Sequence, residues 1–125
     1  MKILVIDDEK SIRDSLQWYL EDLGHEVIVE SAPFHCHVYQ GGDCTNALSC
    51  TDVLLIDYNM PDMNGLEFIQ VLKERGCKGI TKNMILMSGD AMAIDMDVAE
   101  KLGCTVVQKP MSFDFLNNWL LNIKA

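Results

Sequence analysis

The sequence has no apolar stretch long enough to cross a lipid bilayer. Its first apolar run is short and stops at paired aspartates, so the N-terminal residues do not form the apolar core of a signal peptide. Basic residues are also few, with 10 lysines and arginines against 19 aspartates and glutamates and a formal net charge of -9. Such an excess of negative charge opposes attraction to nucleic acid and to anionic membranes. We therefore expect a cytoplasmic protein that binds neither DNA nor a membrane directly.

A disulfide framework and a second domain are not expected either. The 5 cysteines are odd in number and follow no regular spacing, which is typical of free thiols in a reducing compartment. A chain of 125 residues, 49% of them hydrophobic, has the size of one compact domain. No internal repeat or low-complexity tract interrupts it. We expect residues 1–125 to form a single domain.

Four short segments, most of them apolar, each run into a polar or charged residue. They are residues 3–6 before Asp7 and Asp8, residues 53–56 before Asp57, residues 84–87 before Ser88, and residues 105–108 before Lys109. If these segments are parallel strands, their carboxyl ends meet at one edge of a sheet, where such sheets bind ligands. The sequence therefore predicts carboxylates, a hydroxyl and an ammonium at a single edge, an arrangement suited to a divalent cation and a phosphoryl group.

The segments between these runs have the apolar spacing of helices. We expect helices from Ser11, as the cap, to Gly24, from about Leu66 towards Gly76, over about 91–102 with Gly103 as the stop, and over about 113–123 with Ser112 or Asp114 near its start. Residues 25–30 are expected to form a further strand because of their valine and isoleucine content. Regular alternation of strands and helices predicts an α/β fold, a doubly wound parallel sheet with helices on both faces.

The predicted cluster of carboxylates indicates a metal ion. Neighbouring carboxylates repel one another, so they either share protons or hold a hard cation. Mg2+ accepts one or two carboxylates, a carbonyl and several waters. Asp8 and Asp57 offer side chains, and the backbone carbonyl of Asn59 can turn back towards the same ion.

Four motifs, in this order and spacing, resemble those of the receiver domains of bacterial response regulators, and the resemblance covers almost the whole chain. The motifs are Asp7-Asp8, Asp57-Tyr58-Asn59-Met60-Pro61-Asp62-Met63-Asn64-Gly65, Ser88-Gly89 and Lys109-Pro110. The family implies a flavodoxin-like fold with five strands in the order 2-1-3-4-5. It also implies that Asp57 accepts the phosphoryl group, that Asp7 and Asp8 bind Mg2+ with Asp57 and Asn59, and that Ser88 and Lys109 contact the phosphoryl group. A cis peptide between Lys109 and Pro110 is implied as well.

The same resemblance implies a signalling role rather than a turnover enzyme. The phosphoryl donor would be a phosphohistidine on a sensor histidine kinase or a phosphotransfer protein. Phosphorylation would change the binding of a downstream protein, and the domain would catalyse only its own phosphorylation and dephosphorylation.

The chain departs from the family at Val106, where many receivers carry a Tyr or Phe that rotates after phosphorylation. The change would then pass through the helix over 91–102, where Met92, Met96 and Ala99 form a stripe beside Ile94. We expect packing to cover both sides of this helix. If it does not, the methionine stripe offers a contact surface for a partner or for a second copy of the chain in a homodimer.

A second departure lies between the second and third strands, where residues 31–42 contain a proline, a glycine pair and no helical period. We expect an irregular segment in place of much of the second helix, with a short helix over 43–49. His35, Cys36 and His37 are residue types that bind Zn2+, but they lack the spacing of a tetrahedral site. A partner-specific loop is the favoured interpretation.

The alternative function is a Mg2+-dependent phosphohydrolase of the haloacid dehalogenase type, which also uses an aspartate nucleophile at a strand end. Such enzymes usually carry a second aspartate two residues later, where this chain has Asn59, and they need a cap for which the length leaves little space. A further alternative is a receiver fragment of a larger regulator or hybrid kinase. No output domain follows Ala125, which favours a complete single-domain regulator.

Overall fold

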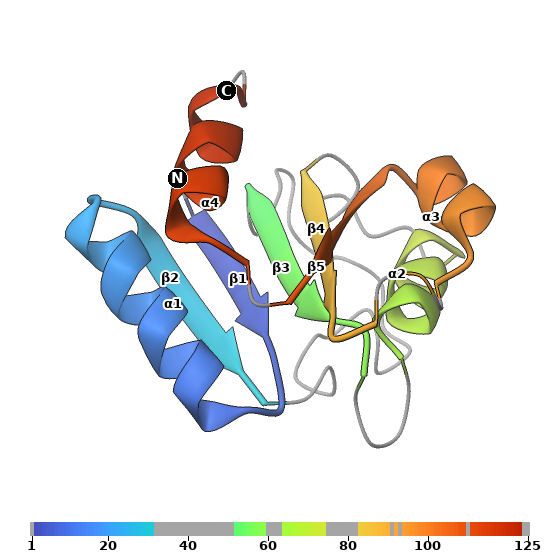
Figure 1. The fold of residues 1–125 in the computed structure, drawn as a ribbon, viewed down its shortest axis with the longest axis horizontal. Coiled ribbons are helices and arrows are strands. Elements are labelled where there is room, and N and C mark those ends of the chain that lie inside the picture. The colour runs from blue at the N-terminus through green and yellow to red at the C-terminus, as the bar shows by residue number, and fades with distance from the viewer. Residues whose placement is uncertain are drawn as a thin grey trace.

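The computed structural model describes residues 2–31, 52–59, 64–74, 83–90, 92, 94–109 and 111–123, without the side chains of residues 72 and 73. The strands are β1 (Lys2–Ile6), β2 (Glu26–Glu30), β3 (Val53–Asp57), β4 (Met84–Ser88) and β5 (Cys104–Gln108). The helices are α1 (Lys10–Asp22), α2 (Gly65–Glu74), α3 (Met96–Leu102) and α4 (Phe113–Leu121). All strands are parallel, in the order β2-β1-β3-β4-β5, which confirms the predicted topology (Figure 1).

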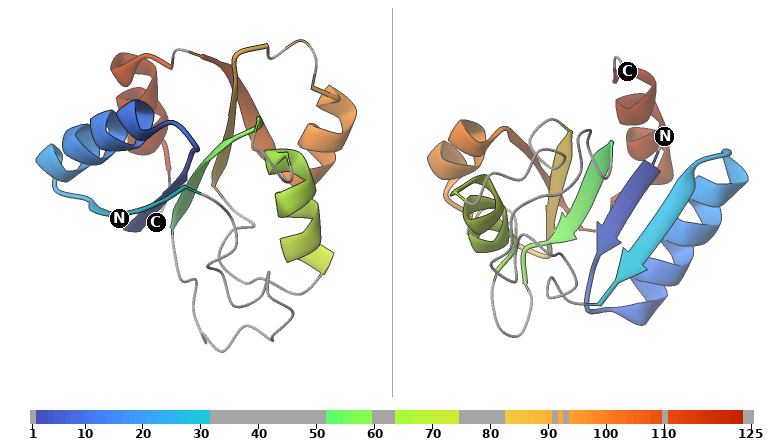
Figure 2. Two further views of the ribbon diagram at one scale, coloured as in Figure 1. Left: turned by 90° about the horizontal axis from the view of Figure 1, so that it is seen from below. Right: turned by 180° about the vertical axis from the view of Figure 1, so that it is seen from behind.

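The sheet lies between two helical layers, with α1 and α4 on one face and α2 and α3 on the other (Figure 2). Successive strand residues point to opposite faces, so each strand supplies both cores. The core under α1 and α4 includes Ile3, Val5, Val53, Leu55, Ile85 and Met87. The core under α2 and α3 includes Ile6, Leu54, Ile56, Met84 and Leu86. Because both faces are covered, β3 and β4 are buried along their whole length.

The helix boundaries confirm some predicted caps and correct others. Gly24 and Gly103 have φ values of 93° and 81° and follow α1 and α3, as their positions in the sequence predict. Ser112 caps α4 by accepting a hydrogen bond from the Phe115 N–H. The prediction that Ser11 caps α1 is wrong, because Glu9 is the N-cap and the helix already begins at Lys10.

The predicted start of α3 near residue 91 is also wrong. The side chain of Asp95 accepts hydrogen bonds from the N–H groups of Asp97 and Val98, so the helix begins only at Met96. Met92 therefore precedes the helix and is 95% exposed, and Met96 in the first turn is exposed as well. The expectation that packing covers the methionine stripe is thus wrong, although Ala99 is buried.

Several expectations concern residues outside the described parts of the chain. They are the irregular segment and short helix between β2 and β3, the group His35, Cys36 and His37, and the peptide between Lys109 and Pro110. Within the described residues, none of the helices has the length and apolar character needed to cross a membrane.

Candidate functional site

The sheet register brings the predicted polar residues to one edge. Ile6 on β1 pairs with Ile56 on β3, and Asp57 at the end of β3 pairs with Met87 on β4. Ser88 at the end of β4 pairs in turn with Gln108 on β5. The residue after β1, the last residues of β3 and β4 and the residue after β5 therefore lie side by side, at the arrowheads of the strands in Figure 1.

Asp7, directly after β1, is fixed from several directions. It has no exposed surface, and its Oδ1 accepts a hydrogen bond of 2.8 Å from the Glu9 N–H. Its backbone N–H donates to Glu30 O at the end of β2, and its backbone carbonyl accepts from Arg13 Nη1 at 2.7 Å. Arg13 was not singled out from the sequence, since its contact depends on how α1 folds back beside β1. These bonds hold the Asp7 carboxylate at the strand end.

Lys109 joins the two buried aspartates. Its Nζ lies 3.1 Å from Asp7 Oδ2 and 3.3 Å from Asp57 Oδ1, and 3.6 Å from Glu9 Oε1. The ammonium is largely buried, whereas the Glu9 side chain is mostly exposed. The contacts to Asp7 and Asp57 thus carry most of the electrostatic interaction, because the Glu9 pair is screened by water.

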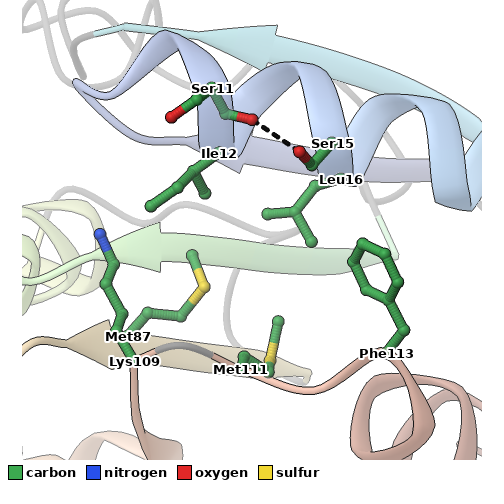
Figure 3. A pocket seen from close by; sticks show the side chains of 8 residues that line it. All are labelled: Ser11, Ile12, Ser15, Leu16, Met87, Lys109, Met111 and Phe113. Atoms are coloured by element: carbon green, nitrogen blue, oxygen red, sulfur yellow. Dashed lines mark hydrogen bonds between the residues drawn. The ribbon is translucent and has the colours of Figure 1, made fainter.

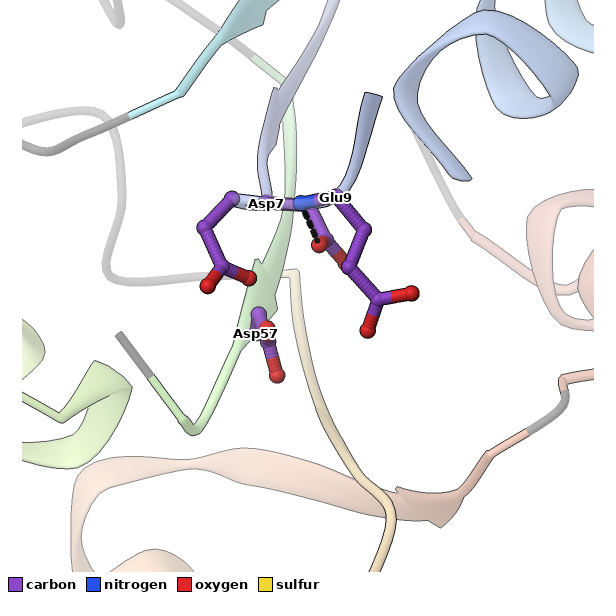
Figure 4. Close-up of side chains that lie close together, drawn as sticks. Asp7, Glu9 and Asp57 are labelled. Atoms are coloured by element: carbon purple, nitrogen blue, oxygen red, sulfur yellow. Dashed lines mark hydrogen bonds between the residues drawn. The ribbon is translucent and has the colours of Figure 1, made fainter. Parts of the chain in front are cut away.

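The acidic cluster is larger than the sequence predicted. Asp7, Asp8, Glu9 and Asp57 each offer a carboxylate oxygen, and these oxygens lie within 4.8 Å of one another. Figure 4 shows Asp7, Glu9 and Asp57 gathered beyond the ends of β1 and β3. Glu9 was missed, although it directly follows the acidic pair. An all-oxygen donor set of which two members are exposed to water fits Mg2+, which keeps bound waters and needs few carboxylates.

Negatively charged groups lie close together in the site. Burial and the neighbouring charge of Asp7 raise the pKa of Asp57 from 3.8 to about 6, although Lys109 opposes this rise. For Lys109, burial alone would lower the pKa, but the hydrogen bond with Asp7 and the charges of both aspartates raise it above 10.5. The ammonium is therefore charged at neutral pH, and the carboxylates around it outnumber it. A divalent cation would remove this imbalance.

Ser88 is buried at the end of β4 beside Lys109. Its Oγ accepts a hydrogen bond of 3.0 Å from the Asp90 N–H, and its backbone carbonyl accepts one of 2.7 Å from the Lys109 N–H. A serine hydroxyl that accepts one bond still has its own proton to donate. The residues that the sequence places on β4 and β5 are thus neighbours of Asp57 in space.

Gly65 lets α2 begin against the phosphoacceptor candidate. A Cβ at position 65 would lie 2.6 Å from the backbone oxygen of Asp57 and 2.7 Å from Leu86 Cδ1. The Gly65 N–H also donates a hydrogen bond to Tyr58 O at 3.0 Å. This bond holds the start of α2 close to the end of β3. Only a residue without a side chain fits this close approach.

We expect Gly65→Ala to lower the free energy of unfolding by about 1–3 kcal/mol, because the backbone of β3 cannot yield to the added methyl group. Urea denaturation measures the change. Gly89→Ala is the matched control, since a Cβ at that position meets nothing within 4 Å. Equal stability of the two variants would contradict the close approach.

An apolar pocket of about 240 Å³ lies beside the site, between α1 and the segment that leads from β5 into α4 (Figure 3). Lys109 is at one end and Phe113 at the other, and the Phe113 ring stacks on Tyr19 of α1 with centroids 4.2 Å apart. The remaining apolar lining comes from Ile12, Leu16, Met87 and Met111. The pocket and the acidic cluster therefore share Lys109.

Comparison with known proteins gives one family. A family model described as the response regulator receiver domain matches residues 3–120. Over 73 residues the chain is 34% identical to the chemotaxis protein CheY1 of Helicobacter pylori, covering 58% of this chain and 56% of that protein. It is 35% identical over 119 residues to the transcriptional regulatory protein TdiR of Thauera aromatica, covering 91% of this chain and 43% of TdiR. The chain thus spans about half the length of these curated relatives.

Solved structures agree with the fold. A CheY-like receiver domain from Methylobacillus flagellatus superimposes with a TM-score of 0.77 at 20% identity, covering 99% of this chain and 98% of the other. Chemotaxis protein CheY4 of Vibrio cholerae gives a TM-score of 0.74 at 24% identity, covering 98% of both chains. At these identities the likeness concerns the fold alone.

Proposed function

This chain belongs to the response regulator receiver domain family, and we propose that Asp57 is the residue that accepts its phosphoryl group. Receiver domains are signalling domains of two-component systems rather than classical enzymes. One observation carries the proposal. Asp57 is 1% exposed at a strand end, and its Oδ1 lies 3.3 Å from a buried ammonium that also contacts Asp7. We further propose that residues 1–125 act together as one receiver domain.

The proposed reaction is an in-line displacement at phosphorus. A carboxylate oxygen of Asp57 forms a bond to phosphorus while the bond from phosphorus to the donor's imidazole nitrogen breaks, and that nitrogen keeps the electron pair and takes up a proton from water. The products are an acyl phosphate on Asp57 and a free histidine. Lys109 offers its ammonium to the phosphoryl oxygens, and Ser88 offers its hydroxyl proton.

We propose that Asp7, Asp8, Asp57 and the backbone carbonyl of Asn59 hold Mg2+, as the oxygen-rich cluster supports. When bound, the ion supplies positive charge that neutralises the carboxylates and the phosphoryl oxygens. Asp7 is held for this task by the Glu9 N–H and by Arg13. The Asn59 N–H donates to Asp57 Oδ1 at 3.1 Å and so orients the carboxylate of the nucleophile.

The proposed donor is a phosphohistidine on a sensor histidine kinase or a phosphotransfer protein. Because the apolar pocket between α1 and Phe113 shares Lys109 with the site, a protein that brings phosphohistidine to Asp57 would cover this pocket. We propose that a downstream protein or a second copy of the chain then recognises the phosphorylated form, for which the exposed Met92 and Met96 are a candidate contact.

Phosphorylation by a small donor tests the assignment without a partner. We expect the wild-type chain, incubated with Mg2+ and acetyl phosphate or phosphoramidate, to gain the mass of one phosphoryl group. Asp57→Asn should gain none under the same conditions, as intact-mass measurement would show. A chain that never gains this mass, or an Asp57→Asn variant that does, would overturn the assignment.

The match over residues 3–120 favours this function over a haloacid dehalogenase type of phosphohydrolase. Incubation of the wild-type chain with Mg2+ and a phosphomonoester distinguishes the two functions. Repeated turnover of a phosphomonoester would indicate the hydrolase, whereas one phosphoryl group per chain would indicate the receiver.

A further inference from the structure

The side chain of Gln108, the last residue of β5, connects the segment that follows Ser88 with the segment that begins at Lys109. Its Nε2 lies 2.5 Å from the carbonyl oxygen of Gly89 and 3.3 Å from that of Lys109. Two carbonyl oxygens approach the same end of the amide, and only the NH2 end of a glutamine can donate to both. The contacts themselves therefore determine the orientation of the amide.

The contact with Gly89 reaches Ser88 through one peptide group. The Gly89 carbonyl and the Asp90 N–H belong to the same peptide unit, and in a trans peptide they point in opposite directions. Gln108 binds the carbonyl side, while Ser88 Oγ accepts from the N–H side at 3.0 Å. The Gly89–Asp90 peptide is thus held between the Gln108 amide and the Ser88 hydroxyl.

Packing among the described residues does not hold this peptide. Gly89 is exposed, and a Cβ at its position would meet nothing within 4 Å. The hydrogen bond from Gln108 therefore restricts a peptide that the side chains of the described residues do not enclose. Because hydrogen bonds in a chain polarise one another, a donor on the Gly89 carbonyl also strengthens the bond from Asp90 N–H to Ser88 Oγ.

We propose that Gln108 is a positioning residue for the Ser88 hydroxyl, acting through the Gly89–Asp90 peptide, so that the hydroxyl proton is free to point at the phosphoryl group. This inference rests on the proposed function of Asp57 and Ser88. Gln108 itself does not touch the reacting atoms. It aligns the loop after β4 with the loop after β5 and hence Ser88 with Lys109.

The test is a double-mutant cycle with Ser88. Gln108→Leu removes the donor and leaves an apolar side chain that is one atom shorter. With acetyl phosphate and saturating Mg2+, we expect it to slow phosphorylation of Asp57 about 3- to 10-fold, the range of one lost hydrogen bond. In a Ser88→Ala background, the same substitution should change the rate less than about 2-fold, because the group it positions is absent. The Mg2+ dissociation constant, measured by calorimetry, should stay unchanged.

Two further variants separate positioning from general damage. Gln108→Arg keeps N–H donors and should retain most of the wild-type rate. Gln17→Leu makes the same chemical change on α1, where the glutamine amide donates to Glu21 at the protein surface, and should behave as wild type. Thermal unfolding of each variant checks that the fold is intact.

Each outcome decides the inference. An unchanged rate in Gln108→Leu, or an equal loss with and without Ser88, would overturn the role of Gln108 while leaving Asp57 as the acceptor. A wild-type chain that gains no phosphoryl group would overturn the proposed function and this inference with it.

Discussion

Lys109→Met is expected to lower the free energy of unfolding by about 3 kcal/mol at neutral pH in buffer without divalent cations. The Lys109 ammonium lies 3.1 Å from Asp7 and 3.3 Å from Asp57, and both carboxylates are almost completely buried. Its removal leaves two negative charges facing each other away from water. Urea denaturation with EDTA present measures the loss.

The matched control is Lys101→Met on the exposed side of α3, which should change stability by less than about 0.5 kcal/mol. Addition of Mg2+ should recover part of the loss in Lys109→Met, because an ion that binds only the folded state stabilises it. Phosphorylation should remain slow even then, since the ion does not replace the ammonium at the phosphoryl oxygens. Equal stability of Lys109→Met and wild type in EDTA would show that the aspartates are not held by this charge.

Asp57→Asn is expected to stabilise the cation-free protein by about 2–3 kcal/mol above pH 6. Burial and the charge of Asp7 raise the pKa of Asp57 from 3.8 to about 6 in the folded chain. A carboxyl with a raised pKa favours folding while it is protonated, so its contribution is complete below about pH 4 and is lost as pH rises towards about 6. Asparagine has nearly the same shape and never ionises, so the variant avoids this loss.

Denaturation curves over a pH series measure the effect. The difference in stability between Asp57→Asn and wild type should be small near pH 4, should grow up to about pH 6, and should then level off. Asp14→Asn is the control, because Asp14 is exposed and its carboxylate pairs with Lys10 at the surface of α1. Saturating Mg2+ should shrink the difference, since the ionised Asp57 then gains a partner. A constant difference at all pH values would mean that the Asp57 carboxyl titrates normally.

The strands and the edge that carries the site follow from the sequence for a clear physical reason. A strand covered on both faces must be apolar along its length, so the polar residue that ends each run is conspicuous. Asp57 after residues 53–56 and Ser88 after residues 84–87 stand out in this way, and the structure places them on adjacent strands. The order of the strands in the sheet was predicted from the family resemblance, because the apolar segments alone do not determine it.

The first residues of α1 and α3 were harder to predict from the sequence than the strands were. Several residues before α3 are able to cap a helix, and the choice of Asp95 depends on where the chain turns after β4. Glu9, Arg13 and Gln108 act through side-chain contacts with Lys109 or with backbone carbonyls. Such contacts depend on the tertiary structure, and no spacing of residues in the sequence predicts them.

The outer position of β2 in the sheet limits what this strand contributes to the site. Among the described residues, β2 gives the site one backbone hydrogen bond, from the Asp7 N–H to Glu30 O, and no catalytic side chain. Asp7, Asp57, Ser88 and Lys109 all belong to the other strands and their ends. A substitution in β2 therefore acts on the site through the main chain that positions Asp7, so its effect on phosphorylation should be indirect.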